Sequence, residues 1–150
     1  MSQAGRGKRG FTLVELVIVL VVIGLASVIA LPALDRGIKK RQARLTVMAL
    51  AATAREMRRQ AIDQGKLRQL TVSPSEESYL ASGGDIIHLP EGIRITGVAG
   101  GEPIGDRLTQ FVFFPNGSML GGAIELSDRQ GAVYLIRLDS FVGRVVVTKQ

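Results

Sequence analysis

Few side chains of this sequence could carry out chemistry. Its 150 residues include a single histidine, His88, and no cysteine. A serine nucleophile would need Ser118 or Ser127 beside that histidine together with an aspartate, and the spacing gives no support for such a triad. The absence of cysteine excludes disulfides, thiol nucleophiles and cysteine-bound metals. We therefore expect no catalytic residue and no enzyme.

Two further kinds of site can be considered. A glycine-rich segment matches a phosphate-binding loop in composition only: Gly97, Gly100, Gly101 and Gly105. Neither a Lys-Ser/Thr pair nor a predicted helix follows it, so a surface loop is the better interpretation. Asp128 and Asp139 lie in predicted turns where a calcium ion could bind, but no Asp-x-Asp-x-Asp run supports this. The sequence thus predicts no metal and no cofactor.

One carboxylate has a position that needs an explanation. Glu15 stands at the start of an apolar stretch in which residues 16–34 carry no charge. An ionised group inside a bilayer costs on the order of 2–3 kcal/mol even on lenient insertion scales. Such a carboxylate is tolerated when a cation lies close to it or when it lies at the level of the lipid headgroups. Glu15 is therefore either an assembly residue or an interfacial residue.

The segment around Glu15 has the length of a membrane span. As a helix with a rise of ~1.5 Å per residue, residues 11–31 extend about 31 Å, which matches a ~30 Å hydrocarbon core. An ordinary secretory signal has a shorter apolar core of ~7–15 residues. Basic side chains precede the span at Arg6, Lys8 and Arg9, so the N-terminus should stay in the cytoplasm while the remainder crosses. We predict a transmembrane helix and assembly segment over residues 11–34.

The junction before this span resembles the signal of type IV pilins and type II secretion pseudopilins. The residues that carry the resemblance, in order and at the family's spacing, are Gly10, Phe11, Thr12, Leu13, Glu15 and Pro32. The resemblance implies that a prepilin peptidase removes residues 1–10, a basic leader, by cutting after Gly10 and then N-methylates Phe11. It implies that Glu15 pairs with the terminal amine of a neighbouring subunit, and that Pro32 belongs to the same assembly segment. The implied partners are other pseudopilins, major and minor, the prepilin peptidase and inner-membrane lipid.

Residues 35–65 are predicted to continue the helix in amphipathic form and to end at Gly65. Pro32 and Gly37 are places where it could bend. Apolar residues with helical spacing should pack on a sheet: Val47, Leu50, Ala54, Met57 and Ala61. A neighbouring arc carries a basic flank: Lys40, Arg41, Arg44, Arg55, Arg58 and Arg59. This flank could be a solvated face, contact anionic lipid, bind nucleic acid or form ion pairs with neighbouring subunits.

Residues 66–150 change to short β-rich runs separated by turn residues. The candidate strands are Arg68–Val72, Tyr79–Ser82, Ile86–Leu89, Ile93–Val98, Gln110–Phe114, Ala123–Ser127, Ala132–Leu138 and Arg144–Thr148. We expect an α+β fold in which a long N-terminal helix packs on a C-terminal antiparallel β-sheet domain, the lollipop shape of a type IV pilin. Asn116 and Gly117 are expected to form a type I′ turn.

A second resemblance lies in the C-terminal part. It rests on a turn, a double glycine and a final hairpin: Phe114, Pro115, Gly117, Gly121, Gly122, Gly143 and Arg144. These residues resemble the signature of H-type minor pseudopilins of type II secretion and of their relatives, the T-type minor pilins. Residues 66–110 match no family pattern.

The resemblances imply two functions. The first is a minor pseudopilin at or near the tip of a periplasmic pseudopilus, which helps to drive protein export through the outer membrane. It would be a single-pass inner-membrane protein with a cytoplasmic N-terminus and a periplasmic C-terminal domain. The alternative is a T-type minor pilin that binds DNA in natural transformation, and a bitopic anchor unrelated to filaments is a third possibility. The net charge of +6 does not favour nucleic acid, because residues 69–150 carry six basic and nine acidic side chains.

Overall fold

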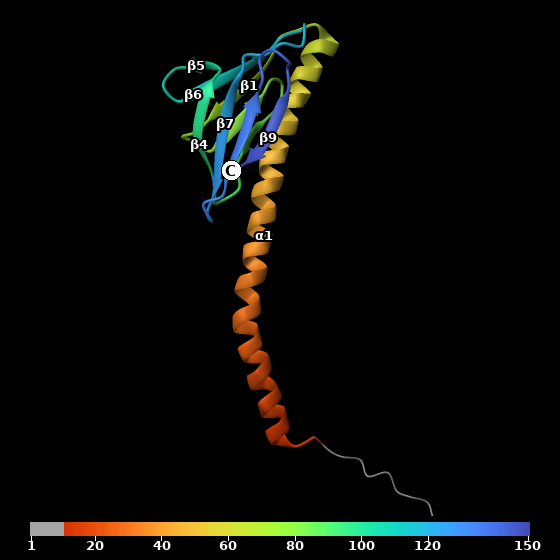
Figure 1. Ribbon diagram of the computed structural model, residues 1–150, viewed down its shortest axis with the longest axis vertical. Helices are drawn as coiled ribbons and strands as arrows, with labels where there is room; N and C mark the ends of the chain where they lie inside the picture. Colours follow the sequence, from red (N-terminus) through yellow and green to blue (C-terminus); the bar gives the residue numbers. More distant parts are fainter. Residues whose placement is uncertain (1–10) are drawn as a thin grey trace, which may run out of the picture. The chain divides into compact units, whose positions relative to one another are not determined.

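The computed structural model describes residues 11–150, and the side chains of all of these except residues 29–40. The chain divides into two units, Met1–Lys39 and Lys40–Gln150. Helix α1 (Leu13–Gln64) is followed by strands β1 (Arg68–Ser73), β2 (Ser78–Ala81), β3 (Ile86–His88), β4 (Ile93–Gly100), β5 (Glu102–Ile104), β6 (Leu108–Phe113), β7 (Gly122–Asp128), β8 (Val133–Leu138) and β9 (Val145–Lys149) (Figure 1). The expected leader, residues 1–10, and the side chains of Pro32 and Gly37 lie outside the described residues.

Both ends of α1 have a local chemical cause. At the start, the Thr12 hydroxyl accepts a hydrogen bond from the Glu15 amide at 3.3 Å, and the Thr12 carbonyl accepts one from the Leu16 amide at 3.2 Å. Thr12 is thus the N-cap. At the other end Gly65 has a φ of +62°, the left-handed conformation that ends helices at low cost in glycine. The predicted end of the helix at Gly65 is confirmed.

The first part of α1 is apolar and uncovered. Large apolar side chains between Phe11 and Val28 are exposed, including every residue from Leu16 to Ile23. Among the described residues, no helical stretch has both the length and the hydropathy that crossing a bilayer requires. The expected span over residues 11–34 continues past Val28 into residues 29–40, whose side chains lie outside the described set, and it stays a prediction.

The β-rich part forms two antiparallel sheets where the sequence suggested one. The first has the strand order β3-β2-β1-β6-β5, and the second has the order β4-β7-β8-β9. All eight expected strands are present, with ends shifted by at most two residues. The strand that was missed is β5, which contains Pro103 and lies at the edge of its sheet, where a proline removes no ladder hydrogen bond.

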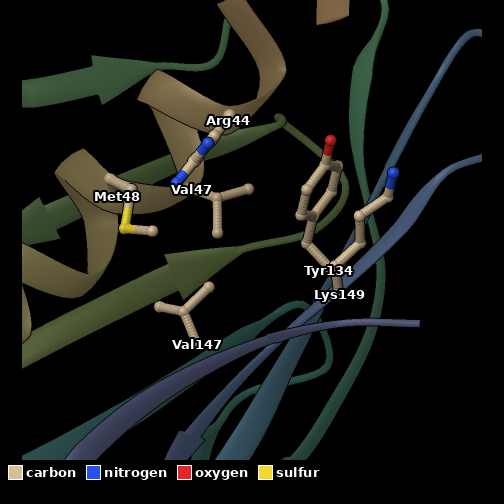
Figure 2. Close-up of a pocket in the computed structure, with 6 residues that line it drawn as sticks. All are labelled: Arg44, Val47, Met48, Tyr134, Val147 and Lys149. Atoms are coloured by element: carbon tan, nitrogen blue, oxygen red, sulfur yellow. The ribbon is translucent and has the colours of Figure 1, made fainter. Parts of the chain in front are cut away.

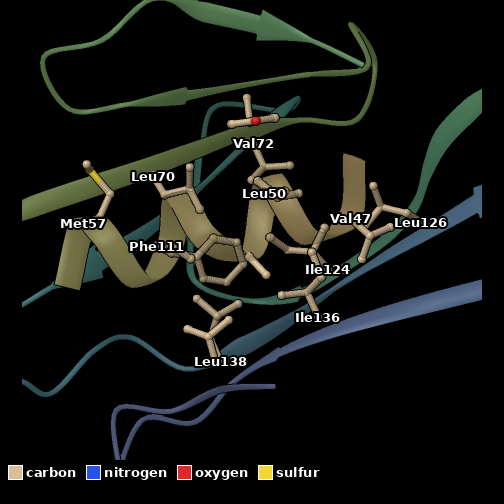
Figure 3. Packing of buried hydrophobic residues seen from close by; sticks show 14 of the residues in the cluster. Val47, Leu50, Met57, Leu70, Val72, Phe111, Ile124, Leu126, Ile136 and Leu138 are labelled. Carbon is tan, nitrogen blue, oxygen red and sulfur yellow. The ribbon is translucent and has the colours of Figure 1, made fainter. Parts of the chain in front are cut away.

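One hydrophobic core joins the helix to both sheets. The predicted apolar stripe is confirmed, because all five of its residues are buried, and Ala43 and Ala51 extend it. Figure 3 shows Val47 and Leu50 of α1 among Val72 of β1 and Ile124 of β7. The antiparallel fold with a helix packed on it is therefore as expected.

Glu77 ties the two sheets together. It lies in the turn between β1 and β2 and is the only non-glycine residue with a positive φ, 49°, in the described part of the chain. Its carboxylate accepts a hydrogen bond from the Ile95 amide of β4 at 2.7 Å, and its carbonyl accepts one from the Leu89 amide at 2.7 Å. Because β4 is an edge strand, the Glu77 carboxylate provides an acceptor for a backbone amide that has no partner within the sheet.

The expectation of a surface loop over the glycine-rich segment is wrong for its first half. Gly97 and Gly100 lie in β4, and a bulge between Ile95 and Gly97 shifts the pairing of that strand with β7. The chain then passes from one sheet to the other at Gly101, whose amide donates to the Gly121 carbonyl at 3.2 Å. Only Gly105 lies in a turn. The glycines permit a close backbone crossing, which composition alone does not distinguish from a loop.

Candidate functional site

The start of α1 is a helix-capping arrangement. With Thr12 as the N-cap, Glu15 is the third helical residue, and the two residue types form the Thr-x-x-Glu pattern of a capping box. A carboxylate in the first turn also interacts favourably with the helix dipole. Thr12 was not expected as the N-cap, although the spacing of Thr12 and Glu15 was the signal for it.

The Glu15 carboxylate remains available for a second interaction. Its side chain is exposed, and within the described residues it has no ion-pair partner. Phe11, the residue expected to become the new N-terminus, is 74% exposed. The predicted pairing of Glu15 with a neighbouring subunit is compatible with this geometry and stays a prediction, as does cleavage after Gly10, which lies outside the described residues.

The first signature turn differs from the expected type. The Gly117 amide donates to the Phe114 carbonyl at 2.9 Å, so that Pro115 and Asn116 are the central residues. Asn116 has no positive φ, whereas Gly117 has a φ of +83°. The turn is therefore type I followed by a left-handed glycine, and the expected type I′ turn at Asn116-Gly117 is wrong. Proline at the second position, where its ring presets φ, was the signal for type I.

The second signature hairpin is closed by Asp139. One oxygen of its carboxylate accepts hydrogen bonds from the amides of Val142 and Phe141, at 3.1 and 2.9 Å. These two bonds lower the pKa of Asp139, with a smaller contribution from the nearby charges of Arg144 and Arg137. The Asp139 amide donates to the Arg144 carbonyl at 2.9 Å. The last strand, β9, pairs with the strand before it, β8, and this pairing begins at Val145 and Leu138.

Arg58 of α1 joins the two signature hairpins. Its Nε donates a hydrogen bond to the Gly117 carbonyl at 2.8 Å. Gly143, with a φ of +65°, lies against the same guanidinium: a Cβ there would come within 2.8 Å of Nη2 and 2.5 Å of the Gly117 oxygen. Both glycines are buried. Two hairpins that are far apart in the sequence therefore meet on one helix side chain, and each has a glycine at the meeting point.

The paired glycines of the signature have a different role. A Cβ on Gly121 would lie 2.9 Å from the Ser140 Cβ, and one on Gly122 would lie 2.8 Å from the Phe111 ring and overlap the Ala99 carbonyl. Gly122 begins β7 directly against the end of β4. This double glycine lets the start of β7 pass close to its neighbours, so it is a packing feature.

The structure divides the basic flank into separate groups. Arg55 and Arg58 form hydrogen bonds within the molecule. The Nη2 of Arg55 donates to the Val145 carbonyl at 3.0 Å, and Arg58 donates to the Gly117 carbonyl. Arg59 pairs with Glu56 and Asp63 at 2.6 Å each. Hydrogen bonds from Arg59 and Gln60 lower the pKa of Glu56 to about 2, and Glu56 in turn raises the pKa of Arg59.

The remaining described arginines of the flank, Arg41 and Arg44, are exposed. Lys40 lies outside the described side chains. Arg55 and Arg59 are exposed too. The four interpretations of the basic flank, as a solvated face or as a contact with lipid, nucleic acid or neighbouring subunits, therefore stay predictions.

A groove borders the beginning of this flank. It has a volume of about 350 Å³ and is lined by Arg44, Val47, Met48, Tyr134, Val147 and Lys149. Figure 2 shows the first three residues on α1 and the other three on β8 and β9. Among the side chains that the structure describes, no carboxylate lines it. The groove has room for an apolar group next to two cations. No local pattern indicated it, because its two sides are far apart along the chain.

The titratable residues considered for catalysis and metal binding are dispersed. His88 is exposed on β3. One Asp128 oxygen accepts from the amides of Gln130 and Ala132 at 2.9 Å each, which closes the turn between β7 and β8. In the part of the chain that the structure describes, no group of acidic or histidine residues is arranged to hold a metal ion.

Comparisons with known proteins identify the family. Residues 5–31 match the prokaryotic N-terminal methylation motif. The chain is 33% identical over 124 residues to type II secretion system protein H of Xanthomonas campestris pv. campestris, which covers 81% of this chain and 73% of that protein. The chain belongs to the family of type II secretion system protein H. No solved structure matches the pseudopilin.

Family membership settles the class of function. The chain is a minor pseudopilin of type II secretion, a structural subunit and not an enzyme. The methylation motif and the family relationship indicate other pseudopilins and a prepilin peptidase as partners, and anchoring at the inner membrane. The two resemblances in the sequence therefore led to the right family.

Proposed function

We propose that this pseudopilin is incorporated at or near the tip of a periplasmic pseudopilus and helps to drive protein export through the outer membrane. The supporting observation is the uncovered apolar surface of α1, where consecutive side chains from Leu16 to Ile23 are exposed on every side of the helix. A helix that is apolar all round needs a cover. For a filament subunit, that cover is lipid before assembly and the helices of neighbouring subunits afterwards.

The proposed topology places each segment in a defined compartment. The prepilin peptidase removes residues 1–10 on the cytoplasmic side by cutting after Gly10, and Phe11 becomes the N-methylated first residue. Residues 11–34 cross the inner membrane once in contact with its lipid, residues 35–65 continue the helix, and residues 66–150 lie in the periplasm. The basic leader supports this direction, since positive charges stay on the cytoplasmic side.

Glu15 is proposed to guide assembly. Its carboxylate is exposed and lacks an ion-pair partner within the described part of the chain, while its backbone amide is held by Thr12. In the membrane an unpaired carboxylate is costly, and an ammonium from the next subunit would offset that cost. Pro32 belongs to the same proposed assembly segment.

DNA capture has less support. Three of the basic side chains that could meet phosphates, Arg55, Arg58 and Arg59, are engaged within the molecule. Residues 69–150 carry a net negative charge, which gives little counterion release to favour phosphate binding.

Substitution of Glu15 by Leu tests the assembly role. We expect Glu15→Leu to leave membrane insertion and protein level unchanged but to reduce crosslinking to the other pseudopilins and secretion, because the intersubunit pair is lost. Thr12→Ala is the matched control, because it removes the N-cap, at a cost of ~1 kcal/mol, and keeps the carboxylate. Equal losses in both variants would mean that Glu15 acts only through capping, and unchanged crosslinking in Glu15→Leu would contradict the assembly role.

A further inference from the structure

The hairpin between β8 and β9 presents two apolar side chains to solvent. Phe141 is 96% exposed and Val142 is 62% exposed. An aromatic side chain so fully in water is unusual on a protein surface that has no partner, and aromatic anchors of this kind dominate many binding interfaces. We call residues 139–143 the hairpin tip.

The hairpin tip is held in one shape. Two amide hydrogen bonds to the Asp139 carboxylate fix the backbone of Phe141 and Val142, and the Gly143 amide donates to the Asp139 carbonyl at 3.0 Å. Gly143 lies against Arg58 of α1. An exposed ring on a fixed loop loses little conformational entropy on binding, which is the advantage of a preorganised anchor.

Charges around the hairpin tip indicate what would cover it. Arg137 and Arg144 are exposed and lie close enough to Asp139 to act on its charge. Two arginines thus accompany one carboxylate, which already closes the loop, so these three side chains together are net positive. A complementary surface would combine an apolar pocket of the size of an aromatic ring with carboxylates at its rim.

The position of the hairpin tip favours a protein partner over a membrane. Gly143 contacts α1 at Arg58, which is 17 residues beyond Arg41 near the start of this unit. At ~1.5 Å per residue this is about 25 Å along the helix. The tip is therefore far from the end at which the chain enters the unit, where anionic headgroups would be expected.

We propose that the hairpin tip is the anchor by which this chain binds a neighbouring pseudopilin, whose surface provides an apolar pocket rimmed with carboxylates. This inference rests on the proposed function as a filament subunit. It assigns a contact to the globular unit that is separate from the contacts of the apolar helix. Phe141 fills the pocket, Val142 extends the apolar contact, and the two arginines face the acidic rim.

The test uses the full-length protein in membranes together with the other pseudopilins of its secretion system. Because the chain has no cysteine, Ser140→Cys places a single thiol beside Phe141, to which a photoreactive maleimide can be attached. Ile87→Cys is the matched control, an exposed apolar position on β3 of the other sheet. We expect crosslinks from residue 140 to a pseudopilin identified by mass spectrometry, and none of that product from residue 87.

Two further variants separate the ring from its support. In the Ser140→Cys background, Phe141→Ala should lower the crosslink yield at least about 10-fold, as for a central interface residue, with an unchanged melting temperature because the ring is solvent-exposed. Asp139→Ala keeps the ring but frees the loop, and should give an intermediate loss. An unchanged yield in Phe141→Ala, or equal yields of the same product from residues 140 and 87, would overturn the proposal.

Other products would also overturn it. A crosslink to lipid would assign the hairpin tip to the membrane. Binding of a single-stranded oligonucleotide that is lost in Phe141→Ala would assign it to base stacking. The failure of this inference is distinguishable from that of the proposed function: if Glu15→Leu abolishes incorporation while Phe141→Ala does not weaken the crosslink, only the hairpin tip is wrongly assigned.

Discussion

Replacement of Gly143 by alanine tests how the two signature hairpins are held on α1. Gly143 has a φ of +65°, and the left-handed conformation costs an L-residue roughly 1–2 kcal/mol. The new Cβ would also lie 2.5 Å from the Gly117 oxygen and against the Arg58 guanidinium. The guanidinium must then move and give up its bond to Gly117, and a hydrogen bond to a charged group is worth about 1.5–3 kcal/mol. We expect Gly143→Ala to lower the free energy of unfolding by about 3–5 kcal/mol.

A second glycine provides the control. Gly131 has a φ of +81°, and a Cβ added there would meet no other atom within 4 Å, so Gly131→Ala incurs the backbone cost alone. The assay is thermal and denaturant unfolding of the detergent-solubilised full-length protein, followed by near-ultraviolet circular dichroism of the buried Tyr79 and Tyr134. In an Arg58→Ala background the cost of Gly143→Ala should decrease, since the two residues contact each other. Equal losses at positions 143 and 131 would refute the role given to Arg58.

Two more predictions concern the same hairpin. The folded-state pKa of Asp139 is lowered below its ordinary value of 3.8. Its carboxylate therefore contributes stability that is fully present above pH 3.8 and is lost as the pH falls through the lowered pKa. Asp139→Asn should flatten the decline in melting temperature below pH 3.8, leaving the part due to Glu56, and an unchanged decline would contradict this. Arg144→Ala should reduce the free energy of unfolding by no more than ~1 kcal/mol, because the hairpin hydrogen bond is made by the backbone carbonyl of residue 144, which the substitution keeps. The variant should also leave DNA binding within the nonspecific range of ~10⁻⁴–10⁻⁶ M. Tighter binding in the wild type that is lost in this variant would favour the DNA-binding alternative.

Local patterns in the sequence were sufficient to predict the helix and eight of the nine described strands. Helical spacing identified the buried stripe from Val47 to Ala61, and β-rich runs located eight strands, because each of these depends on residues that are close in the chain. β5 was missed because Gly101 and Pro103 are turn residues in most contexts, and only its place at a sheet edge makes a strand acceptable there.

Features that depend on distant residues could not be predicted in this way. Alternation shows which face of a strand is apolar but not which strands pair, so the division into two sheets was not visible. Arg58 belonged to a basic flank by spacing, and no local signal indicated its bond to Gly117, 59 residues away. The close crossing of Gly100 and Gly122 likewise brings together two glycine pairs that the sequence separates.

The family relationship makes processing of the N-terminus the most direct test of the account. The protein should be extracted from membranes of cells that contain the prepilin peptidase, and its N-terminus should be analysed by mass spectrometry. We expect a mature chain that lacks residues 1–10 and begins with N-methylated Phe11, and an unprocessed chain when the peptidase is absent. An intact bond between Gly10 and Phe11 in the presence of the peptidase, or a mature N-terminus at any other residue, would contradict the account.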